Sequence, residues 1–191
     1  MSSREKILLN IRKNKPDWRP LHGDLQLKAV QSDGQLLFQQ FVESLSKAGA
    51  EVNVLNDEEQ LQPFLQQNFS DLINLLDSEV FGRYKADVSK SELKNIPTVV
   101  IPGQIGVAEN GAIWIDERNF QNRLLPFITE QLVIVLNKAS IVKNMHEAYK
   151  LINPGATGFG VFISGPSKTA DIEQSLVYGA HGAKKLWVLL F

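Results

Sequence analysis

Cysteine is absent from this sequence of 191 residues. Its absence excludes disulfides, thiolate nucleophiles, and zinc or iron–sulfur clusters held by cysteine. Histidine is scarce, and the three residues, His22, His146 and His181, lie too far apart in the sequence to show metal-ligand spacing. We therefore expect the chain to bind no metal and no cofactor of its own, so that any redox cofactor would be held by a partner.

Long apolar runs and a strong excess of one charge are also lacking. No run approaches the roughly 20 apolar residues of a transmembrane helix. The first residues contain no apolar stretch of the kind found in secretory signals. A formal net charge of −1 and a pI near 6.3 give no general attraction to nucleic acid or anionic membranes. The sequence therefore predicts a cytoplasmic protein with no membrane span and no nucleic-acid partner.

Apolar runs and helical patterns alternate along the chain, an order that favours an α/β fold, specifically a three-layer α/β/α domain with a mainly parallel sheet. Runs that are apolar along their whole length suit parallel strands buried on both faces. We expect a single domain over 1–191, with an N-terminal helix and irregular arm over 1–32 and an α/β core over 33–191. Within it we predict helices over 3–13, 33–48, 122–128, 140–152 and 169–178, a loop over 81–95, and strands over 51–55, 98–101, 105–108, 112–115, 132–136, 161–163 and 186–191.

The segment Ser164–Asp171, with the sequence SGPSKTAD, is the first candidate site. If Thr169 caps a following helix, the free N–H groups at the start of that helix point into the loop. Gly165 then permits close approach of a ligand, and Ser167 and Lys168 add hydrogen-bond donors and a positive charge. Such a loop binds a phosphate or a carboxylate.

An equally weighted interpretation is a plain turn between strand and helix. Gly165 and Pro166 would shape the turn, and Ser167 or Thr169 would only cap the helix. Asp171 either faces the loop, where it would repel an anion, or only complements the helix dipole.

Two further segments carry side chains that can react. Glu109 lies in an apparent turn, where a carboxylate can act as a nucleophile or a general base. Asn110-Gly111 between two apolar runs is, however, the commonest hairpin signal, and we favour the hairpin. His181 lies between two glycines, where it either transfers a proton or binds an anion, or only marks the start of the last strand.

These motifs carry a family resemblance. Residues 163–174 (ISGPSKTADIEQ), followed by residues 179–182 (GAHG) and a terminal apolar strand, closely resemble the LUD domain of the LutC lactate-utilisation family. An AETGT-like turn of that family corresponds to residues 108–112 (AENGA), with asparagine and alanine where threonines are usual. The likeness is strong over residues 96–191.

The resemblance implies a fold similar to the NagB, RpiA and CoA-transferase group. It also implies a role in oxidation of L-lactate to pyruvate beside iron–sulfur partner proteins, which suits a chain without cysteine. In this hypothesis the chain binds a small carboxylate or phosphate-bearing ligand, with Glu109 and His181 as candidate catalytic residues. The candidate ligand-binding residues are Asn110, Gly111, Ser164, Gly165, Ser167, Lys168, Thr169 and Asp171.

The same fold group offers an enzymatic alternative. Class I CoA-transferases carry a nucleophilic glutamate in a Ser-Glu-Asn-Gly turn, and Glu109-Asn110-Gly111 match its last three positions. The alternative function is an acyl- or phosphosugar-processing enzyme that uses Glu109. A third possibility, a purely structural or interaction domain, applies if the candidate segments lie far apart.

Overall fold

The computed structural model describes residues 2–14, 34–78, 80, 96–153, 157–170, 176–179 and 181–191. The chain divides into two units, Met1–Gln31 and Ser32–Phe191. In the first unit, helix α1 (Ser3–Lys13) begins with a capping box, in which Ser2 Oγ accepts a hydrogen bond from the Glu5 N–H (3.2 Å) and the Ser2 N–H donates to the Glu5 carboxylate (2.7 Å). The helix predicted over 3–13 is confirmed.

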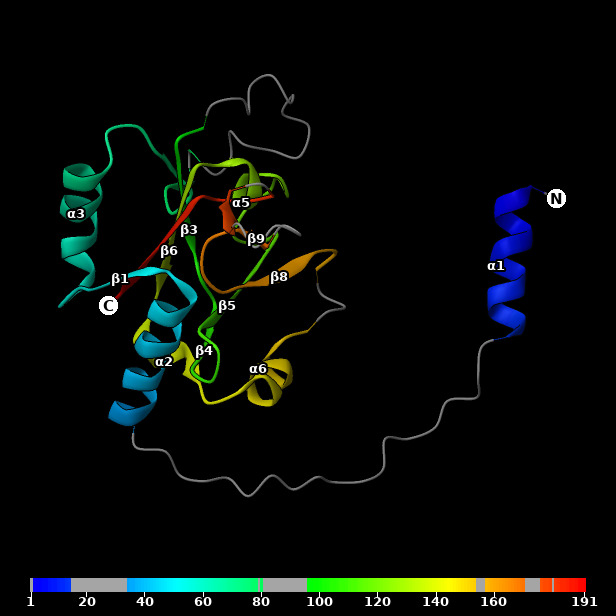
Figure 1. Ribbon diagram of the computed structural model, residues 1–191, viewed down its shortest axis with the longest axis horizontal. Helices are drawn as coiled ribbons and strands as arrows, with labels where there is room; N and C mark the ends of the chain where they lie inside the picture. Colours follow the sequence, from blue (N-terminus) through cyan, green and yellow to red (C-terminus); the bar gives the residue numbers. More distant parts are fainter. Residues whose placement is uncertain are drawn as a thin grey trace. The chain divides into compact units, whose positions relative to one another are not determined.

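The second unit is built on a five-stranded sheet in the order β1-β11-β6-β3-β2, in which every pair of neighbours is parallel (Figure 1). Strands β6 and β11, in the middle of the sheet, are almost wholly buried, which explains why their sequences are apolar without alternation. The predicted α/β class with a mainly parallel sheet is confirmed. The strands are β1 (Glu51–Val54), β2 (Ile73–Asn74), β3 (Thr98–Pro102), β6 (Gln131–Leu136) and β11 (Lys185–Leu190).

Different helices cover the two faces of this sheet. Side chains alternate along a strand, so Ile134 of β6 points to one face and Val133 to the other. The first face packs against helix α2, which buries Phe41 completely, and the second against helix α3, which buries Leu65. The sheet therefore lies between helices, as expected for this class. The helices are α2 (Gly34–Ala48) and α3 (Leu61–Asn68), the latter preceded by the 3₁₀ turn η1 (Glu58–Gln60).

A second sheet of four strands, in the order β7-β4-β5-β8, packs on the same side of the first sheet as α2. Strands β4 and β5 pair antiparallel, with Val107 opposite Ala112, so the favoured hairpin is confirmed. The outer face packs against helix α6 through Ala148. Figure 1 shows α3 and α6 on opposite sides of the stacked sheets. The elements are β4 (Ile105–Val107), β5 (Ala112–Asp116), α5 (Leu125–Ile128), η2 (Lys138–Ser140), β7 (Ile141–Val142), α6 (Met145–Leu151) and β8 (Gly160–Ile163).

The run over 161–163, expected in the parallel sheet, belongs instead to this second sheet. Strand β8 pairs antiparallel with β5, with Ile163 opposite Ile113. The run is apolar because both of its faces are covered: Phe162 packs against Trp114 on the outer side, and its neighbours face the main core. An uninterrupted apolar run therefore indicates a strand covered on both faces, but it does not identify the sheet that the strand joins.

The helix predicted over 169–178 is wrong at both of its described ends. Strand β9 (Lys168–Ala170) pairs antiparallel with strand β10 (Leu176–Tyr178), with Thr169 opposite Val177. Both of these residues are β-branched and suit a strand, and the pairing overrides the local capping signals. Residues 171–175 lie outside the described residues, as does the loop predicted over 81–95.

Helix boundaries after the second sheet also differ from expectation. The helix expected to start at Ser140 starts at Met145, because Ser140 ends the 3₁₀ turn and Asn144 is the cap, accepting a hydrogen bond from the Glu147 N–H (3.0 Å). The short helix expected over 122–128 is confined to α5, where proline fits the first turn.

The turn between β4 and β5 lies directly against α2. Gly111 has a φ of +67°, and a Cβ at this residue would lie 2.7 Å from the backbone nitrogen of Leu45. Glycine is therefore required at this position for two reasons: the backbone is left-handed, and the helix approaches too closely to leave room for a side chain.

Replacing Gly111 with alanine should lower the free energy of unfolding by about 2 kcal/mol or more, because a left-handed backbone alone costs about 1–2 kcal/mol and the helix backbone cannot move aside locally. Urea denaturation measures the change. Gly34→Ala is the matched control, since a Cβ at Gly34 meets nothing within 4 Å. Equal unfolding midpoints for the two variants would contradict the prediction.

Candidate functional site

A pocket of about 210 Å³ lies where the loop after β8 meets the segment before β11. Its polar side chains are those of Ser167, which is half-buried, and His181, which is exposed. Within the described part of the chain neither side chain has a hydrogen-bond partner, so both are available to a ligand. We call this the Ser167 pocket; its remaining walls come from Pro126, Phe127, Leu132, Val161, Phe162, Ile163, Gly165, Pro166, Gly182, Ala183 and Leu186.

Backbone hydrogen bonds bring the two predicted segments together at this pocket. The Ser167 N–H donates to the Ala183 carbonyl (2.8 Å), and the Gly179 N–H donates to the Ser167 carbonyl (3.0 Å). A Cβ at Gly182 would lie 3.2 Å from that of Ser167, so glycine keeps the two loops close. The loop after β8 and the histidine-containing loop therefore line the same pocket.

Lys168 is directed elsewhere. Its ammonium group donates to the carbonyl of Ala48 (2.5 Å), the last residue of α2, and it does not line the Ser167 pocket. A cation at this end of a helix satisfies a free carbonyl and complements the helix dipole. In this structure Lys168 serves as a helix cap.

Glu109 is also bound to a helix end. Its carboxylate accepts a hydrogen bond from the N–H of Met145 (3.0 Å), the first residue of α6, where a negative charge is favoured. The side chain of Asn110 accepts from the Ala112 N–H (3.0 Å) and stabilises the turn. Neither residue, nor Gly111, lines the Ser167 pocket.

One contact joins the hairpin turn to the loop after β8. The hydroxyl of Ser164 donates to the backbone carbonyl of Asn110 (2.8 Å). The two motifs are therefore neighbours, although the Glu109 carboxylate does not share the pocket with His181.

The predicted anion site at a helix N-terminus is not formed as expected. Thr169 lies in β9, so it does not start a helix that would direct free N–H groups into the loop. Asp171 lies outside the described residues. The pocket brings together two of the candidate ligand-binding residues, Gly165 and Ser167, and one candidate catalytic residue, His181.

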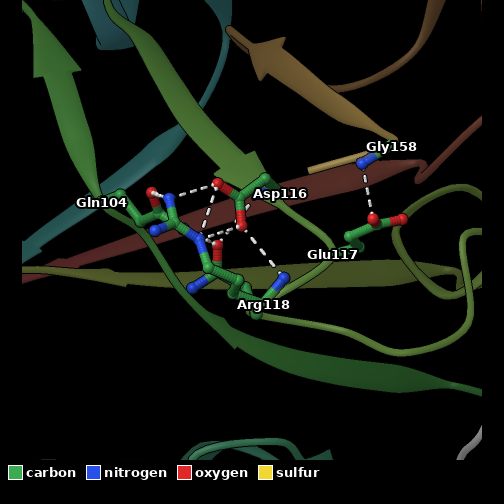
Figure 2. A network of polar contacts seen from close by, with 6 residues as sticks. Gln104, Asp116, Glu117, Arg118 and Gly158 are labelled. Atoms are coloured by element: carbon green, nitrogen blue, oxygen red, sulfur yellow. Dashed lines mark hydrogen bonds and ion pairs between the residues drawn. The ribbon is translucent and has the colours of Figure 1, made fainter. Parts of the chain in front are cut away.

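Sequence reasoning missed a polar network after β5 (Figure 2). Asp116, whose side chain is 1% exposed, forms an ion pair with Arg118 (2.6 Å) and accepts the Arg118 backbone N–H (3.0 Å). Arg118 also donates to the side-chain oxygen of Gln104 (2.9 Å), and Gln104 donates to the side-chain oxygen of Asn119 (2.7 Å). The signal that the sequence offered for this turn is an aspartate in the last position of a strand, followed three residues later by an asparagine.

This network holds the carboxyl group of Asp116 ionised. Burial acts to raise its pKa, but the hydrogen bonds from Arg118 and Gln104 outweigh burial and leave the pKa below the usual value of an aspartate.

A second set of polar contacts, separate from the Asp116 network, surrounds Glu117. Its carboxylate accepts hydrogen bonds from the Gly158 N–H (2.6 Å) and from Arg123 (2.9 Å). Both networks fix turns and lie outside the Ser167 pocket.

Among the residues that the structure describes, no three or more His, Asp or Glu side chains are grouped so as to hold a metal ion. None of the described helices combines the length and apolar character needed to cross a membrane.

Comparison with protein families identifies the chain. The model of the LUD domain matches residues 89–191, which include both pocket loops. The chain belongs to the LUD domain family. The sequence resemblance is thereby confirmed for the region where it was strongest.

Several relatives of this LUD domain protein carry the name lactate utilization protein C. The one from Bacillus pumilus is 30% identical over 139 residues, covering 66% of this chain and 58% of the relative. The one from Anoxybacillus flavithermus is 30% identical over 140 residues, covering 72% of this chain and 61% of the relative. The chain thus spans little more than half the length of these relatives.

A solved structure supports the fold. The crystal structure of a DUF162 family protein from Deinococcus radiodurans superposes with a TM-score of 0.59 at 15% identity, covering 83% of this chain and 98% of that one. Identity this low bears on the fold alone.

Replacing Asp116 with asparagine should lower the free energy of unfolding at pH 7 by about 1 kcal/mol, a typical net value for hydrogen bonds to a charged group when the cation is partly screened by solvent. Because the folded-state pKa is lowered, the contribution is complete above the unfolded-state pKa of about 3.9 and disappears as the pH falls through the folded-state value.

Urea denaturation between pH 7 and pH 2 measures this difference. The difference in the free energy of unfolding between the wild type and Asp116→Asn should disappear toward pH 2. Glu43→Gln, which removes a fully exposed ion pair with Lys47 on α2, is the control and should leave stability unchanged. A difference in the free energy of unfolding that stays constant down to pH 2 would show that the charge of the Asp116 carboxylate does not stabilise the fold.

Proposed function

We propose that this chain is a LutC-like component of L-lactate utilisation and acts with iron–sulfur partner proteins in the oxidation of lactate to pyruvate. The observation that carries the proposal is membership of the LUD domain family together with relatives named lactate utilization protein C. The family match over residues 89–191 includes every described residue that lines the Ser167 pocket.

The partners follow from the chemistry of the reaction. Oxidation of a hydroxy acid to a keto acid releases two electrons, which must pass to an acceptor. This chain contains no cysteine with which to hold an iron–sulfur cluster. The proposal therefore places the electron carriers on partner proteins and leaves to this chain the recognition of the organic acid or of the complex.

The Ser167 pocket supports a small carboxylate as the ligand. Its volume of about 210 Å³ is below the roughly 300–1,000 Å³ of pockets that hold drug-sized molecules. Ser167 supplies a hydroxyl donor, and His181 supplies a ring that donates and, when protonated, attracts an anion. The apolar walls formed by Leu132, Val161 and Leu186 would contact the carbon skeleton.

The enzymatic alternative, acyl or phosphosugar chemistry at Glu109, has weaker support. A nucleophilic carboxylate must reach the substrate, whereas the Glu109 carboxylate is bonded to the α6 N-terminus and lies outside the pocket lining. Trapping of an acyl-glutamate with borohydride after incubation with acyl-CoA compounds tests the alternative directly.

Ligand binding is expected to depend on His181. L-lactate, pyruvate or acetate should raise the melting temperature of the wild type, since a ligand at about 100 times its Kd adds about 2.7 kcal/mol. His181→Gln should abolish this increase. His146→Gln, which changes the exposed histidine on α6 outside the pocket, should leave it intact. Stabilisation by inorganic phosphate or acyl-CoA alone would contradict a carboxylate ligand.

Deletion of the gene should impair growth on L-lactate as the sole carbon source while leaving growth on glucose unchanged. The wild-type gene and the His146→Gln variant should restore growth, and the His181→Gln variant should restore it poorly. A tagged chain isolated from lactate-grown cells should bring iron–sulfur proteins with it. Normal growth of the deletion strain on lactate, with no such proteins recovered, would refute the proposal.

A further inference from the structure

The Ser167 pocket differs in chemistry between its rim and its floor. The polar side chains lie at the rim, where His181 is exposed and Ser167 is half-buried. The floor is formed by Leu132 and Leu186, each 1% exposed, which are paired neighbours near the starts of β6 and β11. A ligand that fills the pocket therefore meets polar groups near the solvent and aliphatic side chains at depth.

The walls of the pocket continue this apolar surface. Val161 and Ile163 are two residues apart on β8, so they point to the same face of the strand, and both pack against the main core. Phe127 of α5 lines the pocket and is 36% exposed, while its ring is held edge-on against Phe159 with 6.5 Å between the ring centres. A fixed and exposed aromatic ring at a pocket favours a ligand that covers it with apolar surface.

Lactate uses only part of this arrangement. Its carboxylate and hydroxyl suit Ser167 and His181, but its side chain is a single methyl group. The pocket volume of about 210 Å³ corresponds to roughly seven water molecules at about 30 Å³ each, so a methyl group held from the rim leaves the floor unfilled. Water in that space would face Leu132 and Leu186, which offer it no hydrogen bonds, and the leucines would lack packing partners.

We infer that the Ser167 pocket selects hydroxy or keto acids whose side chain is a branched hydrocarbon group larger than the methyl group of lactate. The carboxylate binds Ser167 and His181 at the rim, and the hydrocarbon group packs against Leu132, Leu186 and Phe127. This inference rests on the part of the proposed function that makes the pocket an acid site, and it goes further by naming the class of acid.

Three probes separate the contribution of the hydrocarbon group from that of the carboxylate. L-leucate carries the side chain of leucine where L-lactate has a methyl group, and isoamyl alcohol is L-leucate without its carboxylate. Each probe is titrated into the ¹⁵N-labelled full chain and followed by two-dimensional NMR. Burial of one CH₂ group strengthens binding roughly fourfold, so L-leucate should bind at least about tenfold more tightly than L-lactate. Isoamyl alcohol should bind more weakly than L-leucate, and the amide shifts should centre on Ser167, Gly182 and Leu186.

Variants locate the two ends of the ligand. Phe127→Ala should weaken L-leucate binding several-fold and leave L-lactate binding nearly unchanged, because only the longer side chain reaches the ring. Ile128→Ala is the matched control, since Ile128 is the next residue of α5 and is 40% exposed but does not line the pocket. His181→Gln should weaken both acids, because it acts on the carboxylate that they share. Thermal unfolding confirms that each variant is folded.

The outcomes distinguish this inference from the proposed function. Equal affinities for L-leucate and L-lactate, both dependent on His181, would overturn the inference and leave the proposed function intact. Equal losses in Phe127→Ala and Ile128→Ala, amide shifts centred elsewhere, or no binding of L-leucate would overturn it as well, and growth of the deletion strain on lactate then decides the proposed function separately. Tight binding of L-leucate with normal growth of that strain would refute the role in lactate utilisation and support the inference.

Discussion

The C-terminal turn of α2 is the constraint on which the arrangement of the candidate segments depends. Gly49, with a φ of +91°, reverses the chain there, and the Ala50 N–H donates to the Leu45 carbonyl (3.0 Å), so the helix end is closed by a Schellman motif. The Ala48 carbonyl accepts from Lys168. A Cβ at Gly165 would collide with that same carbonyl, so the loop after β8 is seated on the helix end.

The hairpin turn is positioned by the same helix and by a second one. Ser44 of α2 donates to the Ala108 carbonyl (2.8 Å), and Glu109 accepts from the first N–H of α6. Two of the charged residues that the sequence singles out therefore complement helix ends: Lys168 lies at the C-terminal end of α2, and Glu109 lies at the N-terminal end of α6. A residue can thus stand in a family motif because it holds loops in place.

The sequence was sufficient for the core and insufficient for the connections. Strand β11 could be predicted because a fully buried parallel strand has to be apolar at every position, and the β4–β5 hairpin because Asn110-Gly111 carries its own turn geometry. Strand β9 could not, since Thr169 looks like a helix cap locally and only pairing with distant Val177 makes it a strand. The sequence singled out both loops of the Ser167 pocket but did not predict that they lie together, because the hydrogen bonds that join them connect remote backbone groups and leave no local signal.

The Ser167 pocket and a larger cavity of about 510 Å³ lie at opposite edges of the parallel sheet. The Ser167 pocket is lined by Leu132, near the start of β6, whereas the larger cavity is lined by Val135, three residues or roughly 10 Å further along the strand. Enzymes built on open parallel sheets use the carboxyl edge, where strand ends from both sides of a crevice converge. The motif pocket lies at the amino edge and has few reactive groups. The position of the motif pocket therefore differs from the usual position of active sites in such enzymes.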